Sequence, residues 1–318
     1  MERALVTGCN GFVGRALVQR LSGAGYDVWG VDRTEADPAF KGKRYLRGDL
    51  TDAEFVASVL DDASPACIVH LAAQSSVAKS FEAPASTLHD GTAPALHILE
   101  HVRRSKTPVR ILLIGSADEY GSVNPAQIPV REDTPTNPES PYALAKSIQN
   151  HYGRMYAKLY RVDAMMTRSF NHTGPGQSDV FVLSSFAKQV AEIRRGLREA
   201  EIEVGNLDVR RDFMDVRDVC DAYVVLLKKG RMGETYNVCS GQSFKVGDLL
   251  RELCSLAGAH VAIRVDVARL RPVDTPELRG DPSKMSQHTG WTTRHAIKDT
   301  LKSLLDYWDG VLEGKTHG

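Results

Sequence analysis

Residues 3–23 read RALVTGCNGFVGRALVQRLSG, and this stretch decides the fold. Residues 3–7 form a short apolar run that predicts a buried strand, and apolar side chains then recur at helical spacing over residues 11–23. Gly8, Gly11 and Gly14 lie between and within these two segments. Glycines let the backbone turn tightly and approach a pyrophosphate closely, and the helix that follows offers free N–H groups to phosphates. The stretch therefore predicts a strand, a dinucleotide-binding turn and a helix.

The alternation of strand and helix continues downstream of the glycine turn. We expect strands over residues 26–31, 44–47, 66–71, 109–114 and 162–168. Helices are expected over residues 51–60, in a stretch that ends at Arg104, and over residues 140–160, the first capped by Thr51 with Glu54 three residues on. Strands that are apolar almost throughout indicate a parallel sheet covered on both faces. The predicted fold class is α/β, with a Rossmann-type doubly wound parallel sheet.

The pattern changes after about residue 170. Residues 171–176 are expected to form a loop, residues 180–196 a helix, and residues 201–218 a strand, a turn and a charged loop. Pro272, Pro276 and Pro282 punctuate a long loop before a last helix over residues 296–312. We therefore expect an NAD(P)-binding Rossmann domain over residues 1–170 and a smaller, mixed α/β substrate-binding lobe over residues 171–318, some segments of which return to the Rossmann sheet.

Composition excludes several classes of partner. The chain has 318 residues, and its 40 basic and 40 acidic residues give a formal net charge of +0, so no general basic field attracts nucleic acid or an anionic membrane. The five cysteines show no spacing typical of a metal site. No signal peptide opens the chain and no apolar run is long enough to span a bilayer. We expect a soluble cytoplasmic protein without a metal, and local arginines for any anion that it binds.

Tyr142 and Lys146 form a candidate proton-donating pair. They stand four residues apart in the helix expected over residues 140–160, so their side chains share one face. A nearby ammonium stabilises a phenolate, which lowers the pKa of the tyrosine and makes it a useful proton donor near neutral pH. Ser116 comes directly after an expected strand and is a further hydrogen-bond donor for an oxygen on which charge develops.

Acidic and basic residues after the second and third strands bear on the choice of dinucleotide. Asp32 lies eighteen residues after Gly14, where a carboxylate accepts hydrogen bonds from a ribose 2′-hydroxyl, and this favours NADH. Arg33 leaves NADPH open, because its guanidinium either faces a 2′-phosphate or is a solvated surface group. Asp49 is either a residue that meets the adenine or a turn residue. NAD(P)H is therefore the expected cofactor.

Together these residues resemble the extended short-chain dehydrogenase/reductase family, in its nucleotide-sugar branch. The resemblance covers essentially the whole chain and is carried by Gly8 to Gly14, Asp49-Leu50, His70-Leu71-Ala72-Ala73, Ser116, Tyr142-x-x-x-Lys146 and Arg211-Asp212-Phe213, and by the stretches 115–121, 168–177, 211–218 and 236–241. It implies that the cofactor is bound by Gly8, Gly11, Phe12, Val13, Gly14, Asp32, Arg33, Asp49, Leu50, Leu71, Ala72, Ala73, Tyr142 and Lys146.

The resemblance also implies an activity and a substrate. The expected reaction is hydride transfer from NAD(P)H to the C4 ketone of a nucleotide-linked 4-keto-6-deoxy sugar, with GDP-4-keto-6-deoxy-D-mannose giving GDP-D-rhamnose. Tyr142 would donate a proton to the C4 oxygen, Ser116 would hydrogen-bond the same oxygen, and Lys146 would hold the nicotinamide ribose. The positions that match substrate-binding residues are Asp118, Asn171, Arg211 and Arg271, with Asp274 matching a position that meets the nucleotide ribose. A homodimer formed by two paired helices per subunit is also implied.

Two departures from the family pattern separate the candidate functions. Dehydratase relatives for dTDP-glucose carry an Asp-Glu pair as acid and base where this chain has Ala117 and Asp118, and Glu119 matches neither acid and is expected to be structural. An asparagine of many relatives is replaced here by Gly91, and Pro94 is expected to kink that helix. We therefore favour a reductase. The alternatives are a 4,6-dehydratase or epimerase with tightly bound NAD(P), and a non-catalytic dinucleotide-binding protein.

Overall fold

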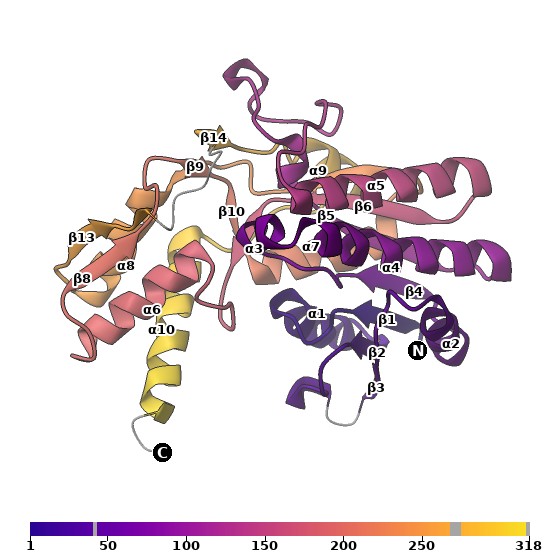
Figure 1. The fold of residues 1–318 in the computed structure, drawn as a ribbon, viewed down its shortest axis with the longest axis horizontal. Helices are drawn as coiled ribbons and strands as arrows, with labels where there is room; N and C mark the ends of the chain where they lie inside the picture. The colour runs from indigo at the N-terminus through magenta and orange to yellow at the C-terminus, as the bar shows by residue number, and fades with distance from the viewer. Residues whose placement is uncertain (41–42, 268–274, 316–318) are drawn as a thin grey trace.

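Seven parallel strands form the central sheet of the molecule (Figure 1). The structure is a computed structural model and describes residues 1–318 except 41–42, 268–274 and 316–318. The strand order is β11-β6-β5-β4-β1-β2-β3. The strands are β1 (Arg3–Thr7), β2 (Asp27–Asp32), β3 (Arg44–Arg47), β4 (Cys67–His70), β5 (Arg110–Ser116), β6 (Ala164–Ser169) and β11 (Thr235–Val238). The chain builds outward from β1 in both directions, so β1 and β4 mark a topological switch point, and the predicted fold class is confirmed.

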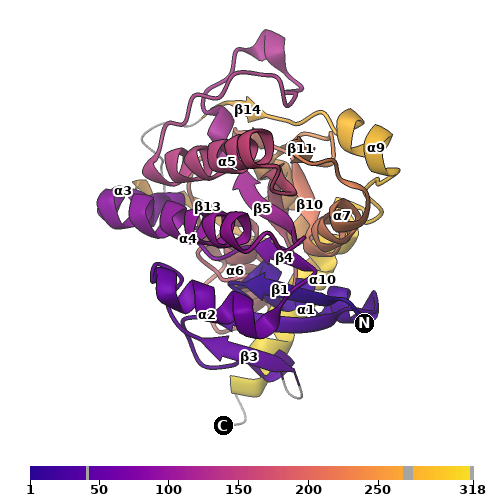
Figure 2. The same ribbon diagram turned by 90° about the vertical axis from the view of Figure 1, so that its right-hand side faces the viewer.

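Helices cover both faces of this sheet, as the turned view shows (Figure 2). One face carries α1 (Phe12–Gly23) and α7 (Val216–Lys229), and the other carries α2 (Ala53–Ala63), α4 (Pro84–Ser105) and α5 (Pro141–Tyr160). Successive side chains of a strand point to opposite faces, so Ala4 and Val6 of β1 pack with the first group while Leu5 packs with the second. Burial on both sides is the reason why the inner strands, such as β1 and β4, are largely apolar.

A smaller group of elements lies beside the sheet, at the left of Figure 1. Its helices α6 (Val182–Arg194), α8 (Val246–Ala257) and α10 (Ile297–Lys315) enclose a separate apolar core, and the strands β8 (Glu201–Val204) and β13 (Ala262–Val265) pair in parallel. The short strand β9 (Arg210–Arg211) lies between β12 (Phe244–Lys245) and β14 (Glu277–Leu278). The remaining helices are α3 (Val77–Glu82) and α9 (Ser283–Thr289). Although β11 and α7 follow residue 170 in the chain, they pack in the central layers, and a domain boundary at residue 170 stays a prediction.

Two expectations for local structure after β6 are wrong. Residues 171–176 do not form only a loop, because β7 (Asn171–Thr173) pairs in parallel with β10 (Phe213–Asp215). The charged segment that was expected to be a loop up to residue 218 ends instead in β10 and the first turn of α7. Asp215 starts this helix, because its side chain accepts a hydrogen bond from the backbone N–H of Arg217.

The cap of one helix near the N-terminus differs from expectation. It is Asp52 that caps α2, because its side chain accepts hydrogen bonds from the backbone N–H groups of Glu54 and Phe55, and Thr51 instead donates to Asp49. Pro94 lies inside α4, which continues to Ser105, and a kink at this proline stays a prediction. Within the described ranges, no helix is both long and apolar enough to cross a bilayer.

Candidate active site

A cavity of about 810 Å³ opens at the carboxyl ends of the central strands. Its walls come from the glycine turn after β1, from the ends of β4 and β5, from the first turns of α5, and from the smaller group of elements beside the sheet. Open parallel sheets bind their ligands at this edge, next to the switch point. Every described residue that was predicted to bind the cofactor or the substrate lines this cavity.

The glycine turn forms a wall of exposed backbone. Gly8 has a φ of +67°, and a Cβ atom there would lie 2.8 Å from the backbone of Ala72. A Cβ atom at Gly14 would lie 2.6 Å from the carbonyl oxygen of Cys9 and nearer still to that of Gly8. No side chain caps α1, so its first N–H groups remain available to an anion. The turn therefore fits a dinucleotide pyrophosphate.

Asp32 and Arg33 lie on the cavity wall at the end of β2. The Asp32 carboxylate accepts hydrogen bonds from the backbone N–H of Asn10 at 3.2 Å and of Thr34 at 3.3 Å. Asp32 thereby fixes the backbone at Asn10 and Thr34, and it also lines the cavity. The guanidinium of Arg33 is exposed and ion-paired with Asp90 at 3.4 Å.

Asp49 has the geometry of a turn residue and also faces the cavity. Its carboxylate accepts hydrogen bonds at 2.9 Å from both the backbone N–H and the hydroxyl of Thr51, and these bonds, together with Arg33 at 3.8 Å, hold the pKa of Asp49 below its usual range. Of the two readings of Asp49, the turn role is confirmed, and a contact with the adenine stays a prediction that its place on the cavity wall allows.

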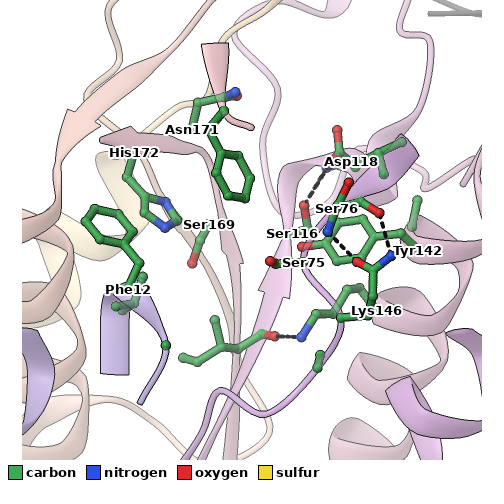
Figure 3. Close-up of a pocket in the computed structure, with 18 of the residues that line it drawn as sticks. Phe12, Ser75, Ser76, Ser116, Asp118, Tyr142, Lys146, Ser169, Asn171 and His172 are labelled. Carbon is green, nitrogen blue, oxygen red and sulfur yellow. Dashed lines mark hydrogen bonds between the residues drawn. The ribbon is translucent and has the colours of Figure 1, made fainter. Parts of the chain in front are cut away.

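Ser116, Tyr142 and Lys146 meet on the opposite wall of the cavity (Figure 3). Ser116 is the last residue of β5, while Tyr142 and Lys146 share one face of α5. The start of that helix is fixed by Ser140, whose side chain accepts a hydrogen bond from the backbone N–H of Ala143. These three side chains, which were predicted from the sequence to share one site, therefore lie on the same wall of the cavity.

The expected lowering of the Tyr142 pKa by Lys146 is wrong in this structure. Burial raises the pKa of Tyr142, the Asp118 carboxylate raises it further, and a hydrogen bond with Ser116 acts in the opposite direction. Lys146 does not lower this pKa, because its ammonium donates instead to the carbonyl oxygen of Ile114 at 2.7 Å. Tyr142 is consequently a protonated phenol throughout the physiological range of pH.

Lys146 is the group in this site that titrates near neutral pH. Burial lowers the pKa of its ammonium to about 8, and the Glu119 carboxylate acts in the opposite direction. His70 lies fully buried behind it at the end of β4, and burial together with Lys146 lowers the pKa of this imidazole to about 3. His70 is therefore neutral, and its Nδ1 pairs with the hydroxyl of Thr7 at 2.8 Å.

One carboxylate reaches the cavity beside the serine. The hydroxyl of Ser116 donates to Asp118 Oδ2 at 3.2 Å, and the backbone N–H of Asp118 donates back to that hydroxyl at 3.2 Å. Ala117, which was matched to the first residue of the Asp-Glu pair of dTDP-glucose dehydratases, offers no acid or base. Glu119 does not line the cavity and is 1% exposed, which agrees with a structural reading of this residue.

Some of the predicted substrate-binding residues are described by the structure, and others are not. Asn171 and Arg211 line the cavity from β7 and β9, and Arg211 donates to the carbonyl oxygen of Thr275 at 2.6 Å. Arg271 and Asp274 lie outside the described residues. The cavity is long enough to join these walls to the glycine turn.

The sequence reading missed several polar residues of the cavity wall, among them Ser75, Ser76 and His172. Ser75 and Ser76 lie in the loop after β4, and His172 stacks on Phe12 with ring centroids 6.2 Å apart (Figure 3). Polar residues just beyond the end of a parallel strand are the signal that predicts the two serines. His172 lies within β7, a segment that was expected to be a loop, so the direction of its side chain was not predictable from periodicity.

Comparison with known proteins places the chain in a family. The profile of the GDP-mannose 4,6 dehydratase family matches residues 5–304. The GDP-6-deoxy-D-mannose reductase of Pseudomonas aeruginosa is 34% identical over 97% of each chain. The solved structure of RMD from the same organism, complexed with NADPH, superimposes with a TM-score of 0.87 at 33% identity and covers 98% of this chain and 100% of that one.

A solved UDP-glucose 4-epimerase of Thermus thermophilus in complex with NAD is more distant. It superimposes with a TM-score of 0.87 at 27% identity and covers 97% of this chain and 99% of that one. The relatives are thus enzymes of NAD(P) chemistry, and the resemblance drawn from the motifs is confirmed. The chain belongs to the GDP-mannose 4,6 dehydratase family, within the nucleotide-sugar branch of the extended short-chain dehydrogenases/reductases.

Proposed function

We propose that the protein is an NAD(P)H-dependent reductase that converts the C4 ketone of GDP-4-keto-6-deoxy-D-mannose to the alcohol of GDP-D-rhamnose. The observation that carries this proposal is the composition of the cavity. It holds Ser116, Tyr142 and Lys146 opposite the glycine turn, with Ala117 in place of one acid of a dehydratase pair. The likeness to the Pseudomonas reductase supports the same activity and substrate.

The chain's own residues supply the proton and the positioning in this reaction. The reduced nicotinamide, when bound, supplies the hydride to C4. Tyr142 donates its phenolic proton to the C4 oxygen, a favourable transfer because an alkoxide is a stronger base than a phenolate. The hydroxyl of Ser116 turns from Asp118 to the same oxygen. This costs little free energy, because the hydrogen bond that it gives up is 3.2 Å long and therefore weak. Lys146 holds the nicotinamide ribose with its ammonium.

The dinucleotide end of the cavity supports NADPH as well as NADH. Both oxygens of Asp32 already accept hydrogen bonds from the turn, Oδ2 from Asn10 and Oδ1 from Thr34. The exposed Arg33 guanidinium forms ion pairs with Asp49 and Asp90, which contribute little and let it turn toward a phosphate. We infer that Arg33 binds the 2′-phosphate of NADPH, and the relative with NADPH bound supports this choice.

We also infer that two copies of the chain associate through α4 and α5. Three exposed apolar side chains recur along α5 at helical spacing: Leu144 is 39% exposed, Met155 is 41% exposed and Leu159 is 60% exposed. Such a stripe on a soluble protein is typical of a contact with a partner. Size-exclusion chromatography with light scattering should give twice the chain mass of 34.9 kDa, and a single chain mass at micromolar concentration would contradict this inference.

A 4,6-dehydratase is the second candidate, because the family description names that activity and Asp118 lies beside Ser116. Removal of water across C5 and C6 needs an acid/base group in addition to Tyr142, and Asp118 is the described carboxylate on the cavity wall next to the serine. Replacement Asp118→Asn separates the two functions. A reductase should keep its turnover within about tenfold, whereas a dehydratase should lose about 100-fold or more. Near-complete loss of the ketone reduction in this variant would count against the reductase.

A further inference from the structure

Glu119 is a buried carboxylate for which the proposed reaction has no direct use. It follows Ser116 by three residues and is 1% exposed. Its Oε1 accepts a hydrogen bond from the backbone N–H of Ser116 at 3.0 Å. The side-chain amide of Asn150 donates to both carboxylate oxygens, at 2.7 and 2.8 Å, and Arg168 Nε donates to Oε2 at 3.3 Å. This carboxylate therefore gathers donors from three different elements.

These donors belong to the elements that carry the proposed catalytic residues. Ser116 ends β5, Asn150 lies on α5, and the side chain of Arg168 reaches across from β6. Asn150 follows Tyr142 by eight residues and Lys146 by four, so all three lie on one face of α5. The Glu119 carboxylate thus ties the strand end that bears the serine to the helix face that bears the tyrosine and the lysine.

The hydrogen bonds around Glu119 suit an ionised carboxylate. Its partners Ser116, Asn150 and Arg168 each donate an N–H to it. Burial raises the pKa of Glu119, and the guanidinium of Arg168 acts in the opposite direction. Arg168 is fixed in turn, because it lies 4.6 Å from the ring centre of Tyr120 and donates to the carbonyl oxygen of Glu132 at 3.1 Å.

The strand end is closed tightly against this carboxylate at Gly115. A Cβ atom at this position would lie 2.6 Å from Asn150 Nδ2 and nearer still to Glu119 Oε1. Because the backbone of Gly115 packs so closely against these two side chains, β5 has little room to shift toward or along α5. Catalytic groups must be held within about 0.5 Å of their productive geometry, and a misplacement of about 1 Å costs about 100-fold in rate.

We propose that Glu119 is a positioning residue for the reduction, whose carboxylate fixes Ser116 against the face of α5 that carries Tyr142 and Lys146. The proposal rests on the proposed function and goes beyond it, since Glu119 touches neither the cavity nor the reacting atoms. The same charge also acts on the proton donors. It raises the pKa of Tyr142 and opposes the lowering of the pKa of Lys146 by burial.

Other titratable groups lie around Tyr142 and Lys146, and they come from several elements. Asp118 lies beside Ser116, His70 faces Lys146 from β4, Tyr223 faces Tyr142 from α7, and Arg168 lies behind Glu119. His70 is neutral above a pH of about 3, so it does not titrate in the range of an activity measurement. Removal of the Glu119 charge should therefore lower the pKa of Lys146 and move the alkaline limb of the pH profile to lower pH.

The test compares Glu119→Gln with Asp218→Asn in the full chain. Asp218 is a matched control: it is also 1% exposed and accepts hydrogen bonds from the backbone N–H groups of Arg294 and His295, but it does not line the cavity. Melting temperature, kcat and KM with NADPH and GDP-4-keto-6-deoxy-D-mannose are measured from pH 6 to pH 10. The pKa of Lys146 is measured by NMR on protein with ¹³C-labelled lysine, with Lys146→Arg for assignment.

Glu119→Gln should reduce kcat by about tenfold to 100-fold with KM within about threefold, and should move the alkaline limb to lower pH, while Asp218→Asn stays near the parent in both. A kcat within about twofold of the parent with an unmoved limb would overturn the proposal, even if the melting temperature falls. If Glu119→Gln does not fold, Asn150→Ala decides: a similar fall in kcat supports the positioning role, and a parental kcat refutes it.

The failure of the proposed function would look different. The parent itself would then leave NADPH unchanged with the keto sugar, and the NMR titration would still decide the role of Glu119. A lower pKa of Lys146 in Glu119→Gln supports the link between this carboxylate and the lysine, and an unchanged pKa contradicts it.

Discussion

At the scale of single residues, the site depends on the phenol of Tyr142, which stays protonated, and on the ammonium of Lys146, which loses its proton above a pH of about 8. Burial and Asp118 raise the pKa of Tyr142, so this side chain enters the reaction as a proton donor. Lys146 carries the titration near neutral pH, because burial lowers the pKa of its ammonium to about 8. The division of roles suits a reduction, in which a proton must be delivered once per turnover and the cofactor held throughout.

The first prediction concerns the donor. Tyr142→Phe removes the only proton that the account assigns to the C4 oxygen, so kcat should fall by about 10²–10⁴-fold while the dissociation constant for NADPH stays within about twofold. Stopped-flow absorbance and fluorescence titration measure the two quantities. Tyr152→Phe is the matched control, because Tyr152 lies on the same helix but not on the cavity wall, and it should keep parental turnover. Parental turnover of Tyr142→Phe would refute the assignment.

The second prediction concerns pH. The pKa of Lys146 is lowered from 10.5 to about 8, so the ammonium is complete below this pH and is lost as the pH rises through it. Accordingly, kcat/KM should decline above a pH of about 8. In Lys146→Arg the guanidinium stays charged, so the decline should be absent from the profile of whatever activity remains. A parental profile that is flat up to pH 10 would show that this ammonium is not needed.

Single residues also show where sequence reading fails. Spacing was sufficient to place Tyr142, Lys146 and Ser116 together, because helix periodicity and strand ends are local properties. The pKa of Tyr142 was not predictable, since it depends on burial and on the direction of the Lys146 ammonium toward the Ile114 carbonyl. Nothing in the spacing shows whether the ammonium of Lys146 meets the phenol four residues away on the same helix face or a backbone oxygen of the neighbouring strand β5.

At the scale of elements, the turn between β1 and α1 is the part that the sequence predicts best. Its glycines are required by the backbone: Gly8 has a positive φ, and Gly14 packs against the carbonyl oxygens of Cys9 and Gly8. Short or polar segments were predicted less well. β7 has three residues and pairs with β10, a segment distant in the sequence, so no local periodicity predicts it.

The third prediction tests this turn. Gly14→Ala would overpack the turn, which costs about 1–3 kcal/mol, so the dissociation constant for NADPH should rise about tenfold or more. Gly23→Ala is the control on the same helix, because a Cβ atom there meets nothing within 4 Å. That variant should bind NADPH normally and gain up to about 1 kcal/mol of unfolding free energy. Equal affinities for the two variants would show that the turn does not hold the cofactor.

The fourth prediction concerns the end of β2. If Arg33 binds the 2′-phosphate, Arg33→Ala should weaken the binding of NADPH by about tenfold to 100-fold, the effect of a hydrogen bond to a charged group. The affinity for NADH should change by less than about threefold. Isothermal titration with both dinucleotides measures this difference. A similar loss for NADH and NADPH would place the role of Arg33 elsewhere.

At the scale of the whole molecule, one cavity joins the two proposed functions of the chain, the binding of the dinucleotide and the binding of the sugar substrate. The glycine turn of the central sheet and the polar residues of the smaller group of elements line the same space of about 810 Å³. The order of strands and helices was predictable from alternation of apolar runs, because a doubly wound sheet is built from local βα units. The arrangement of the smaller elements was not, since β8 pairs with β13 across about sixty residues of chain.

The fifth prediction tests the central claim, that the cavity performs a one-step ketone reduction. GDP-4-keto-6-deoxy-D-mannose is supplied with NADPH or NADH, the absorbance at 340 nm is followed, and the sugar product is identified by NMR. We expect one NAD(P)H to be oxidised for each sugar converted, with a C4 alcohol as the product. No oxidation of either dinucleotide, or conversion of GDP-mannose to the keto sugar without net consumption of NAD(P)H, would contradict it.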